Sequence, residues 1–448
     1  MTLCQNKEYQ INLLLGKQKG KKVIVDFKGG QITSDAGVLL LSGINQKYHL
    51  TEKISNSLED QRDQRYTKYA LEQLIAQRLF QIACGYEDCN DANSLRNDLI
   101  FKVATQRAID EPLASQPTLS RLENSISYKE LYRLAETMLS LYLGTKAKNT
   151  KRIILDVDLF ADPAYGNQQL TFFHGYYGEN VYLPLPIFDA ETGKLVTLVL
   201  LPGNTWGGSI IVRILKRVIK KIRGIFPDVE IIIRADAGFA TPELYEYVEK
   251  TGNGYIMGIP SNERLEAFNE DNLRWTYFLY RLTGESQRLI SSFEYQAASW
   301  SKSRRVIVKT EWNEKGSNQR FLVTNLPGKA EEIYEECYTP RGEECENRIK
   351  ELKLDLKADR LSCSEFKANQ FRLLLHGFAY WLLHLLREEN LKGTELEKAQ
   401  MGTIRLRLLK IGAQIVATCR RIWIHLATGY PLKELFSLVV SRLGFSSA

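Results

Sequence analysis

The sequence predicts an α/β protein, and three observations support that class. Residues 149–262 contain short apolar runs rich in β-branched residues, and turn residues separate these runs. The segment SIIVRILKRVIKKI (209–222) lies between two of the runs. Its apolar residues have helical spacing, and its basic residues lie largely on the opposite face. Three strands that precede a helix and a further strand are typical of a domain in which helices cover a sheet.

Two groups of segments are expected to form strands. The first group is RIILDVDLF (152–160), VYLPLPIFDA (181–190), KLVTLVLL (194–201) and VEIIIRAD (229–236). The second group lies in a different context, where polar turns join the segments FEYQAASW (293–300), RRVIVKTEW (304–312) and RFLVTNL (320–326). We therefore expect a β-rich insertion at 263–335, and helical patterns return from residue 336 onward.

The regions that flank the α/β domain are expected to be mainly helical. Residues 1–25 form a polar lead-in that carries four lysines in GKQKGKK (16–22), which is either a solvated tail or an arm that contacts phosphates. Residues 26–148 show helical spacing, for example in KYALEQLIAQRLFQIA (68–83). Residues 396–448 are expected to form a basic helical region. Between Lys398 and Lys433 it holds seven Lys and Arg residues and no acid.

Composition limits the class of protein. The chain has 448 residues, is 44% hydrophobic and 25% charged, and carries a formal net charge of +7. These values are ordinary for a soluble globular protein, and the mild positive charge permits nucleic acid as a partner. Seven scattered cysteines without a CxxC pair favour reduced thiols over a disulfide framework. No signal-peptide pattern or membrane-spanning run is seen, so a cytoplasmic protein without a membrane partner is expected.

Acidic residues follow two of the expected strands. Asp156 and Asp158 lie on one face of the first strand because side chains alternate with a period of two. Asp236 closes IIIRAD, and Gly238 frees the backbone just beyond it. Ligands of open α/β sheets gather at the carboxyl ends of strands, and acids delivered there can share Mg²⁺. Two such ions support phosphoryl transfer, although an aspartate after a strand is also a common helix cap or turn former.

A third acid is available on a later helix. From about residue 343, helical spacing places Glu346, Lys350 and Lys353 on one stripe. Such a stripe is either a solvated, ion-paired face or the acid of a metal site whose neighbours Arg341 and Lys353 bind phosphate.

These motifs together resemble a known family. The residues that carry the likeness are LDVD (155–158), YGNQ (165–168), RADAGF (234–239) and Y-x-x-R-G followed by ENRIKELK (338–353). Further likeness lies in ITSDAGVLLL (32–41), CGYEDCNDANSLRND (84–98) and SQPTLSRLEN (115–124). The set resembles bacterial insertion-sequence DDE transposases of the group numbered thirteen-eighty, which are related to transposases with a Tyr-Arg-Glu-Lys signature.

The resemblance implies a fold and an activity. It implies an RNase H-like catalytic domain formed by 149–262 and 336–395, interrupted by the β-rich insertion, with DNA ends bound by the helical region 26–148. The implied activity is Mg²⁺-dependent cleavage and strand transfer, with two ions and with Mn²⁺ as a substitute. The implied partners are double-stranded DNA, both terminal inverted repeats and target, and a second copy of the chain on paired ends. The implied location is the bacterial cytoplasm, at the nucleoid when bound to DNA.

The resemblance also assigns roles to residues. The second catalytic aspartate falls on Asp236 and the glutamate on Glu346, and the tyrosine, arginine and lysine of the signature fall on Tyr338, Arg341 and Lys353. Lys350, on the stripe of Glu346, is a further expected phosphate contact. The first aspartate is either Asp158, which we favour, or Asp156.

One feature of the chain departs from the family pattern. The usual spacing places the glutamate four residues after the arginine, a register that lands here on Cys345. Glu346 keeps its seven-residue step to Lys353, so we infer a one-residue insertion in the RGEEC turn.

Two alternative functions remain open from the sequence. The departure at Cys345 is compatible with an inactive or domesticated copy that binds DNA without cutting it. LDVDLF also matches the DxD start of haloacid-dehalogenase-like phosphatases, in which the first Asp would be a nucleophile. Asp236 lacks the adjacent acid that such a phosphatase needs.

Overall fold

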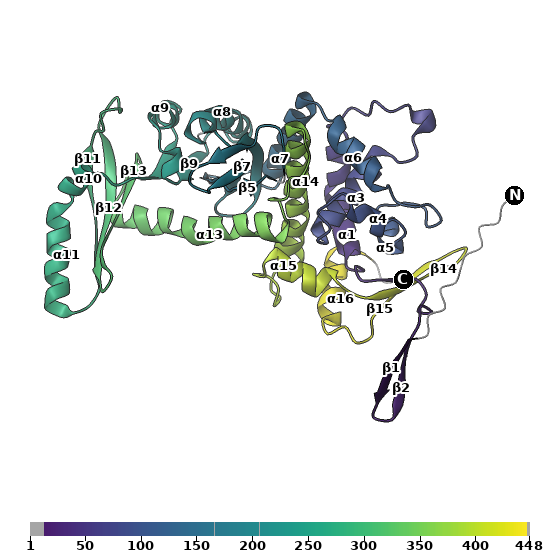
Figure 1. Cartoon of the computed structure of the whole chain (residues 1–448). Coiled ribbons are helices and arrows are strands. Elements are labelled where there is room, and N and C mark those ends of the chain that lie inside the picture. Colours follow the sequence, from purple (N-terminus) through teal and green to yellow (C-terminus); the bar gives the residue numbers. More distant parts are fainter. Residues whose placement is uncertain (1–12, 165, 206, 446–448) are drawn as a thin grey trace.

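The computed structural model describes residues 13–164, 166–205 and 207–445. It shows a mixed α/β protein built around one large mixed sheet (Figure 1). N-terminal helices lie toward one end of this sheet, and its other end projects with a helix as an arm, called the insertion arm below. Within the described residues, no helix is long and apolar enough to cross a membrane.

The sheet has ten strands in the order β11-β12-β13-β10-β9-β4-β7-β5, and β6 and β8 also pair with β7. Its central strands β4, β9 and β10 are parallel to one another, whereas β7 and β13 run antiparallel to their neighbours. The strands are β4 (Arg152–Val157), β5 (Asp162–Pro163), β6 (Phe172–His174), β7 (Glu179–Asp189), β8 (Leu195–Pro202), β9 (Glu230–Ala235), β10 (Gly254–Ile259), β11 (Gln287–Tyr295), β12 (Arg304–Asn313) and β13 (Gly316–Thr324). The four strands expected in the α/β domain are present.

The isoleucines of β9 are buried on both faces of the sheet. Ile231 and Ile233 belong to the main core together with residues of α8 (Gly207–Ile225) and α9 (Pro242–Lys250). Ile232 points to the other face and packs in a second cluster that includes Tyr334. A strand covered on both faces requires a continuous apolar run, which is why three isoleucines follow one another here.

The N-terminal helices and the sheet share one core. The helix α14 (Phe366–Leu385) is buried on nearly all sides, because it contacts β8 on one side and α3, α6 and α7 on the other. The helices of this part are α1 (Val38–Tyr48), α2 (Leu50–Ser55), α3 (Leu71–Ala83), α4 (Asp91–Ser94), α5 (Leu99–Ala104), α6 (Gln116–Ser125) and α7 (Tyr128–Gly144). The expected boundary near residue 149 is therefore a change of secondary structure rather than a gap between independent cores.

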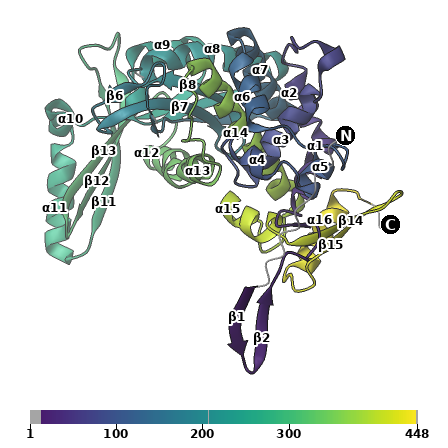
Figure 2. The same ribbon diagram turned by 45° about the vertical axis from the view of Figure 1, so that its right-hand side comes forward.

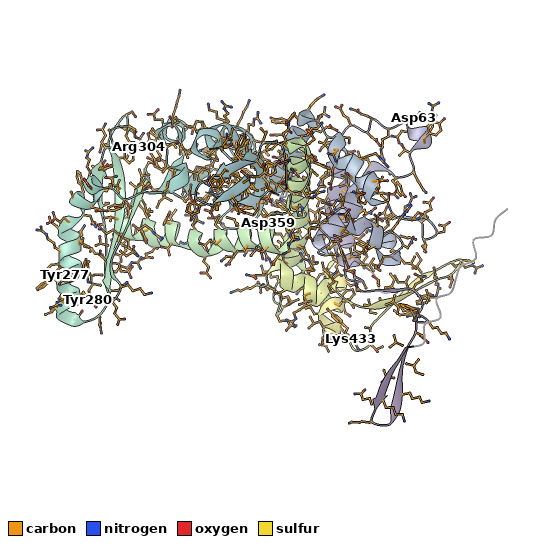
Figure 3. All side chains as sticks on the ribbon, in the orientation of Figure 1. Asp63, Tyr277, Tyr280, Arg304, Asp359 and Lys433 are labelled. Carbon is orange, nitrogen blue, oxygen red and sulfur yellow. The ribbon has the colours of Figure 1, made fainter. Side chains whose placement is uncertain are left out.

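The insertion at 263–335 differs from the expected purely β-rich element. Its three strands are present, but they extend the main sheet through the pairing of β13 with β10. It also contains helices that the sequence did not predict, namely α10 (Glu263–Phe268), α11 (Glu270–Thr283) and the short α12 (Ala330–Glu332). Outward aromatic residues on α11, such as the half-exposed Trp275 and Phe278, obscured its amphipathic pattern. Tyr277 of α11, labelled in Figure 3, packs on Trp312 of β12 with ring centroids 4.7 Å apart.

The two chain ends also contain strands that were not expected. In the region 396–448, helices α15 (Met401–Ile404) and α16 (Lys433–Arg442) flank a hairpin of β14 (Ala413–Ala417) and β15 (Ile422–Leu426). β14 also pairs with β3 (Ile32–Thr33). Within 1–25, the described residues form a hairpin of β1 (Leu13–Gln18) and β2 (Lys21–Val25), while residues 1–12 lie outside the described part. Short runs that contain β-branched residues favour strands in β2 (KKVIV), β14 (AQIVA) and β15 (IWIHL).

A buried ion triad joins the helical part to α14. Glu123 of α6 is fully buried and accepts hydrogen bonds from Arg78 at 2.9 Å and from Arg372 at 2.7 and 3.1 Å. Burial on its own would raise the pKa of Glu123, but the two guanidinium groups together lower it to about 2. The carboxylate therefore stays charged, and the triad fixes α6, α3 and α14 to one another.

Glu123→Gln should lower the free energy of unfolding by about 3–5 kcal/mol, because it leaves two buried guanidinium groups without their anion. Urea denaturation measures this change. The matched control is Glu136→Gln, since Glu136 pairs with Lys221 where both side chains are about one-third exposed, and it should cost less than about 1 kcal/mol. Equal losses for the two variants would contradict the structural role of the triad.

Candidate active site at the ends of β4 and β9

The parallel pairing of β4 and β9 brings two aspartates to one edge of the sheet. Asp156 lies opposite Arg234, and Val157 lies opposite Ala235. Each strand ends there, so Asp158 directly follows β4 and Asp236 directly follows β9. The negative charge of Asp236 raises the pKa of Asp158, as expected for neighbouring carboxylates. The expected meeting of acids from these two strands therefore involves Asp158 and Asp236.

Asp156 has a different environment. Its two carboxylate oxygens accept hydrogen bonds from Arg234 at 2.6 and 2.7 Å, and the side chains of both residues are almost fully buried. A further nitrogen of Arg234 donates to the carbonyl of Cys337 at 2.7 Å. Burial raises the pKa of Asp156, and Arg234 opposes that effect. This arrangement excludes Asp156 as the free nucleophile that the phosphatase alternative requires.

Asp158 is held by its neighbours on two sides. One oxygen accepts from Arg341 at 2.9 Å, and the other accepts from the backbone N–H of Leu159 at 2.8 Å. Its side chain is 19% exposed. Burial raises its pKa to about 6, Arg341 opposes this rise, and Asp236 adds to it. The carboxylate is thus partly accessible and carries unfavourable negative charge at neutral pH.

Asp236 is exposed and is oriented by the turn that follows it. One of its oxygens accepts from the backbone N–H of Gly238 at 2.9 Å. A side chain at Gly238 would meet that same oxygen, since an added Cβ would lie 3.2 Å from it. The glycine after the acid therefore leaves room for the carboxylate to bend back onto the turn.

The helix α13 (Thr339–Lys350) crosses the same edge of the sheet. Arg341, near its start, reaches Asp158, while Cys345 one turn later is buried beside Asp156 and Asp158. Burial raises the pKa of the Cys345 thiol, so the thiol stays protonated. A helix rotates by about 100° per residue, and Glu346 is accordingly exposed and pairs with Lys350 at 3.5 Å.

The other residues expected to contact phosphate differ in how close they lie to the two aspartates. Tyr338 is close to the turn after Asp236, because a Cβ added at Gly258 would lie 3.2 Å from its hydroxyl and 3.4 Å from the nitrogen of Ala237. The ammonium group of Lys353 lies 5.9 Å from the ring centre of Phe160, just beyond β4. Tyr338 and Arg341 therefore border the two aspartates, whereas Lys350 lies on the outer face of α13.

A hollow of about 600 Å³ adjoins these residues. Ala237, Tyr338, Arg341 and Glu346 line it from the site, and Arg288, Lys309 and Arg320 line it from the strands of the insertion. Arg288 pairs with Glu335 at 2.6 Å and Lys309 with Glu311 at 2.5 Å. Arg320 is exposed, and no carboxylate pairs with it in the part of the chain that the structure describes. Sequence reasoning missed these cations because only the fold brings β11–β13 beside α13.

The donor set at the edge is compatible with a divalent cation. Asp158 and Asp236 supply carboxylate oxygens of the kind that Mg²⁺ prefers. The pKa of Asp158 is raised mainly by burial and further by the charge of Asp236, and a bound cation would offset both effects. Across residues 13–164, 166–205 and 207–445, however, no three His, Cys, Asp or Glu side chains gather closely enough to hold a metal. Glu346 does not stand with the two aspartates in this conformation.

Paired carboxylates at the ends of parallel strands, flanked by an arginine and a basic hollow, define a phosphoryl-transfer class of site. The family comparison is specific: the model of the transposase DDE domain group 1 family matches residues 15–447. The chain belongs to this family of transposases. DDE transposase domains generally use divalent metal ions.

Two solved transposase structures resemble the chain over part of its length. A piggyBac transposase in a synaptic complex with hairpin DNA is 11% identical, with 84% of this chain and 80% of that chain covered and a TM-score of 0.42. A Mos1 transposase in a paired-end complex with the left transposon end is 11% identical, with 50% of this chain and 68% of that chain covered and a TM-score of 0.18. A search of curated proteins gave no match.

In the metal-free protein, Asp158 should titrate with a midpoint of about 6, well above its ordinary value of 3.8. Asp236→Asn should lower this midpoint because it removes a like charge, and Arg341→Gln should raise it because it removes an opposite charge. Carboxyl ¹³C NMR of the full-length protein measures both shifts.

The raised pKa of Asp158 also makes the free energy of unfolding depend on pH. Because the pKa of Asp158 is higher in the folded state, its contribution to stability is fully present below pH 3.8 and is lost as pH rises through about 6. A wild-type midpoint near 3.8 that neither variant moves would contradict the described geometry.

Proposed function

We propose that the chain is an insertion-sequence DDE transposase of the bacterial group numbered thirteen-eighty, which cleaves double-stranded DNA at terminal inverted repeats and joins the ends to target DNA. The observation that carries this proposal is the placement of Asp158 beside Asp236, with Arg341 reaching Asp158 from α13. Membership of the transposase family supports it. The mixed sheet with parallel β4 and β9 supports an RNase H-like catalytic domain.

In this proposal, Asp158 and Asp236 hold the metal and Glu346 completes the donor set. Mg²⁺ ions, or Mn²⁺ in their place, would activate a water or a 3′-hydroxyl and stabilise the leaving oxygen. Asp158 is preferred over Asp156, because the oxygens of Asp156 are already bonded to Arg234. Glu346 borders the same hollow as Ala237 and Arg341, so its carboxylate lies on the side from which a DNA strand would approach.

The cations around the site would position the strand. Arg341 and Tyr338 lie next to the aspartates and would contact the phosphates on either side of the scissile bond. Arg320, across the hollow, has the free charge to bind the next phosphate. Lys350 and Lys353 would contact the strand further along α13. Lys350 is bonded to Glu346 at present, so metal binding by Glu346 would release its ammonium group for this role.

The other regions would bind DNA and a second chain. Residues 26–148 would bind the ends of the element, and two copies of the chain would assemble on paired ends. The catalytic domain would comprise 149–262 and 336–395, with the insertion 263–335 delivering Arg288, Lys309 and Arg320 to the hollow.

A catalytically inactive, DNA-binding derivative is the second candidate, and one observation favours it. The position of α13 that faces Asp156 and Asp158 is occupied by Cys345, a buried protonated thiol that is a poor ligand for Mg²⁺. If Glu346 cannot turn toward the aspartates, the chain would bind DNA ends without cutting them.

Asp236→Asn should reduce cleavage of a labelled terminal-repeat duplex in Mg²⁺ by roughly a thousandfold or more, because it removes a ligand without changing side-chain shape. Binding of the same duplex should change by less than about threefold, because the Asp236 carboxylate has no hydrogen-bond donor with which to contact a phosphate. Gel-based cleavage and fluorescence anisotropy measure the two effects. A variant that cuts at the wild-type rate would remove Asp236 from the mechanism.

Glu346→Gln tests the register of α13 against a nearby control. The exchange should abolish cleavage to a similar degree as Asp236→Asn, whereas Glu343→Gln, three residues earlier on the exposed side of the same helix, should leave cleavage unchanged. Single-turnover cleavage rates measure both. If the wild-type chain binds the duplex but never nicks it in Mg²⁺ or Mn²⁺, the inactive derivative is the correct function.

A further inference from the structure

The hairpin β1–β2 carries a concentrated positive charge. Its turn is formed by Lys19 and Gly20, both with positive φ, at 47° and 81°. Lys17, Lys21 and Lys22 flank the turn, and all these lysines are exposed. No acidic residue occurs from Leu13 to Val25. The hairpin is therefore a compact cationic element, with four positive charges and none to neutralise them.

The hairpin β1–β2 stands apart from the main sheet, and the side chains of β2 are largely exposed. Within the described residues it forms a separate two-stranded sheet, and it projects away from the rest of the molecule (Figure 2). Ile24 is 61% exposed, and Val25 is also exposed. An isolated two-stranded hairpin is only marginally stable in water. Its exposed surface is best explained by a partner that covers it.

A second hairpin arises from the same base. β14 pairs with β3, which begins seven residues after β2 ends, so a short segment links the β1–β2 hairpin to the sheet that carries β14–β15. Arg420 and Arg421 are exposed at the tip of β14–β15. Trp423 stacks on His425, and the guanidinium of Arg421 lies 5.6 Å from the Trp423 ring centre. Figure 1 shows both hairpins at the opposite end of the molecule from the insertion arm.

The charge and shape of these hairpins fit duplex DNA. A polyanion is the partner that six exposed cations on two acid-free hairpins would attract. The major groove of B-DNA, about 12 Å wide, admits a two-stranded β-ribbon. We propose that β1–β2 enters a groove of duplex DNA while the tip of β14–β15 contacts the flanking backbone. The two hairpins β1–β2 and β14–β15, called the hairpin arm below, would form a DNA-binding site separate from Asp158 and Asp236. The proposal rests on the proposed transposase function.

The test uses the full-length protein and two fluorescent duplexes, one with the terminal repeat and one with a scrambled sequence. The variant is Lys19→Ser, Lys21→Ser and Lys22→Ser together, which keeps Gly20 and the strands. Each lost phosphate contact should reduce the slope of log affinity against log salt by about 0.9, so the triple variant should lose about 2.7. Affinity at low salt should fall on the order of tenfold or more for both duplexes.

Two control variants test whether the loss of DNA binding is specific to the positive charge of the hairpin lysines. Lys151→Ser, Lys220→Ser and Lys250→Ser remove the same charge from exposed positions on the main body, outside the proposed end-binding region 26–148, and this variant should retain the wild-type slope. Exchange of the three arm lysines for arginine should restore binding. Thermal unfolding of all variants should match the wild type, since every substituted lysine is exposed.

Several results would contradict the proposed DNA-binding role of the hairpin arm. One such result is an unchanged DNA affinity and salt slope in the variant that lacks the three hairpin lysines. Another is an equal loss of affinity and slope in the control variant that lacks three lysines of the main body. Loss of binding to anionic lipid vesicles without loss of DNA binding would also contradict this role, because the partner would then be a membrane surface. The proposed transposase function can fail separately. If the wild-type protein never cleaves DNA but its salt slope still depends on the hairpin lysines, the transposase activity is contradicted and the DNA-binding role of the hairpin arm is supported.

Discussion

The parallel pairing of β4 with β9 is the constraint on which the rest of the site depends. The bidentate ion pair between Asp156 and Arg234 lies across these two strands, one residue pair inside their ends. A one-residue slip would separate this pair and leave both charges buried without partners, which costs several kcal/mol. The register is therefore strongly specified, and it is this register that leaves Asp158 and Asp236 side by side at the edge. Asp156 supports the site by fixing the strands that carry the other two acids.

The helix α13 connects this edge to the insertion. Its inward residues Arg341 and Cys345 pack against the aspartates, and its outward residue Glu346 faces the hollow lined by the strands of the insertion. The insertion is thus part of the same surface as the acids rather than an appendage, because β13 continues the sheet from β10. The cost of this arrangement is a negative charge on Asp158 that burial disfavours. In the proposed function, a bound divalent cation would offset this charge.

Sequence reasoning located the acids because the chemistry there is local. A buried strand followed by an aspartate can be recognised from IILDVD or IIIRAD alone. The bounds of β9 were placed within one residue, whereas the first strand was extended to Phe160, three residues beyond the end of β4 at Val157. The proposed preference for Asp158 over Asp156 rests on the hydrogen bonds from Arg234 to Asp156. These residues lie 78 positions apart, so the period-two pattern of the strand does not reveal their pairing. The hairpins β1–β2 and β14–β15 were missed because short β-branched runs in a lysine-rich or arginine-rich context are also compatible with helix or tail. The basic wall of the hollow arises from pairing between distant strands, which no local pattern encodes.

The central proposal is that Asp158 and Asp236 hold a metal ion and that Glu346 turns toward them to complete the donor set. Fe²⁺ placed in the full-length protein in place of Mg²⁺, with ascorbate and peroxide, cuts the polypeptide only close to the bound ion, and mass spectrometry of the fragments maps the cuts. The account predicts three groups of cuts, directly after β4, directly after β9 and along α13 near Glu346, all suppressed by excess Mg²⁺. Cuts confined to other segments, or cuts near α13 without any after β4 and β9, would contradict it.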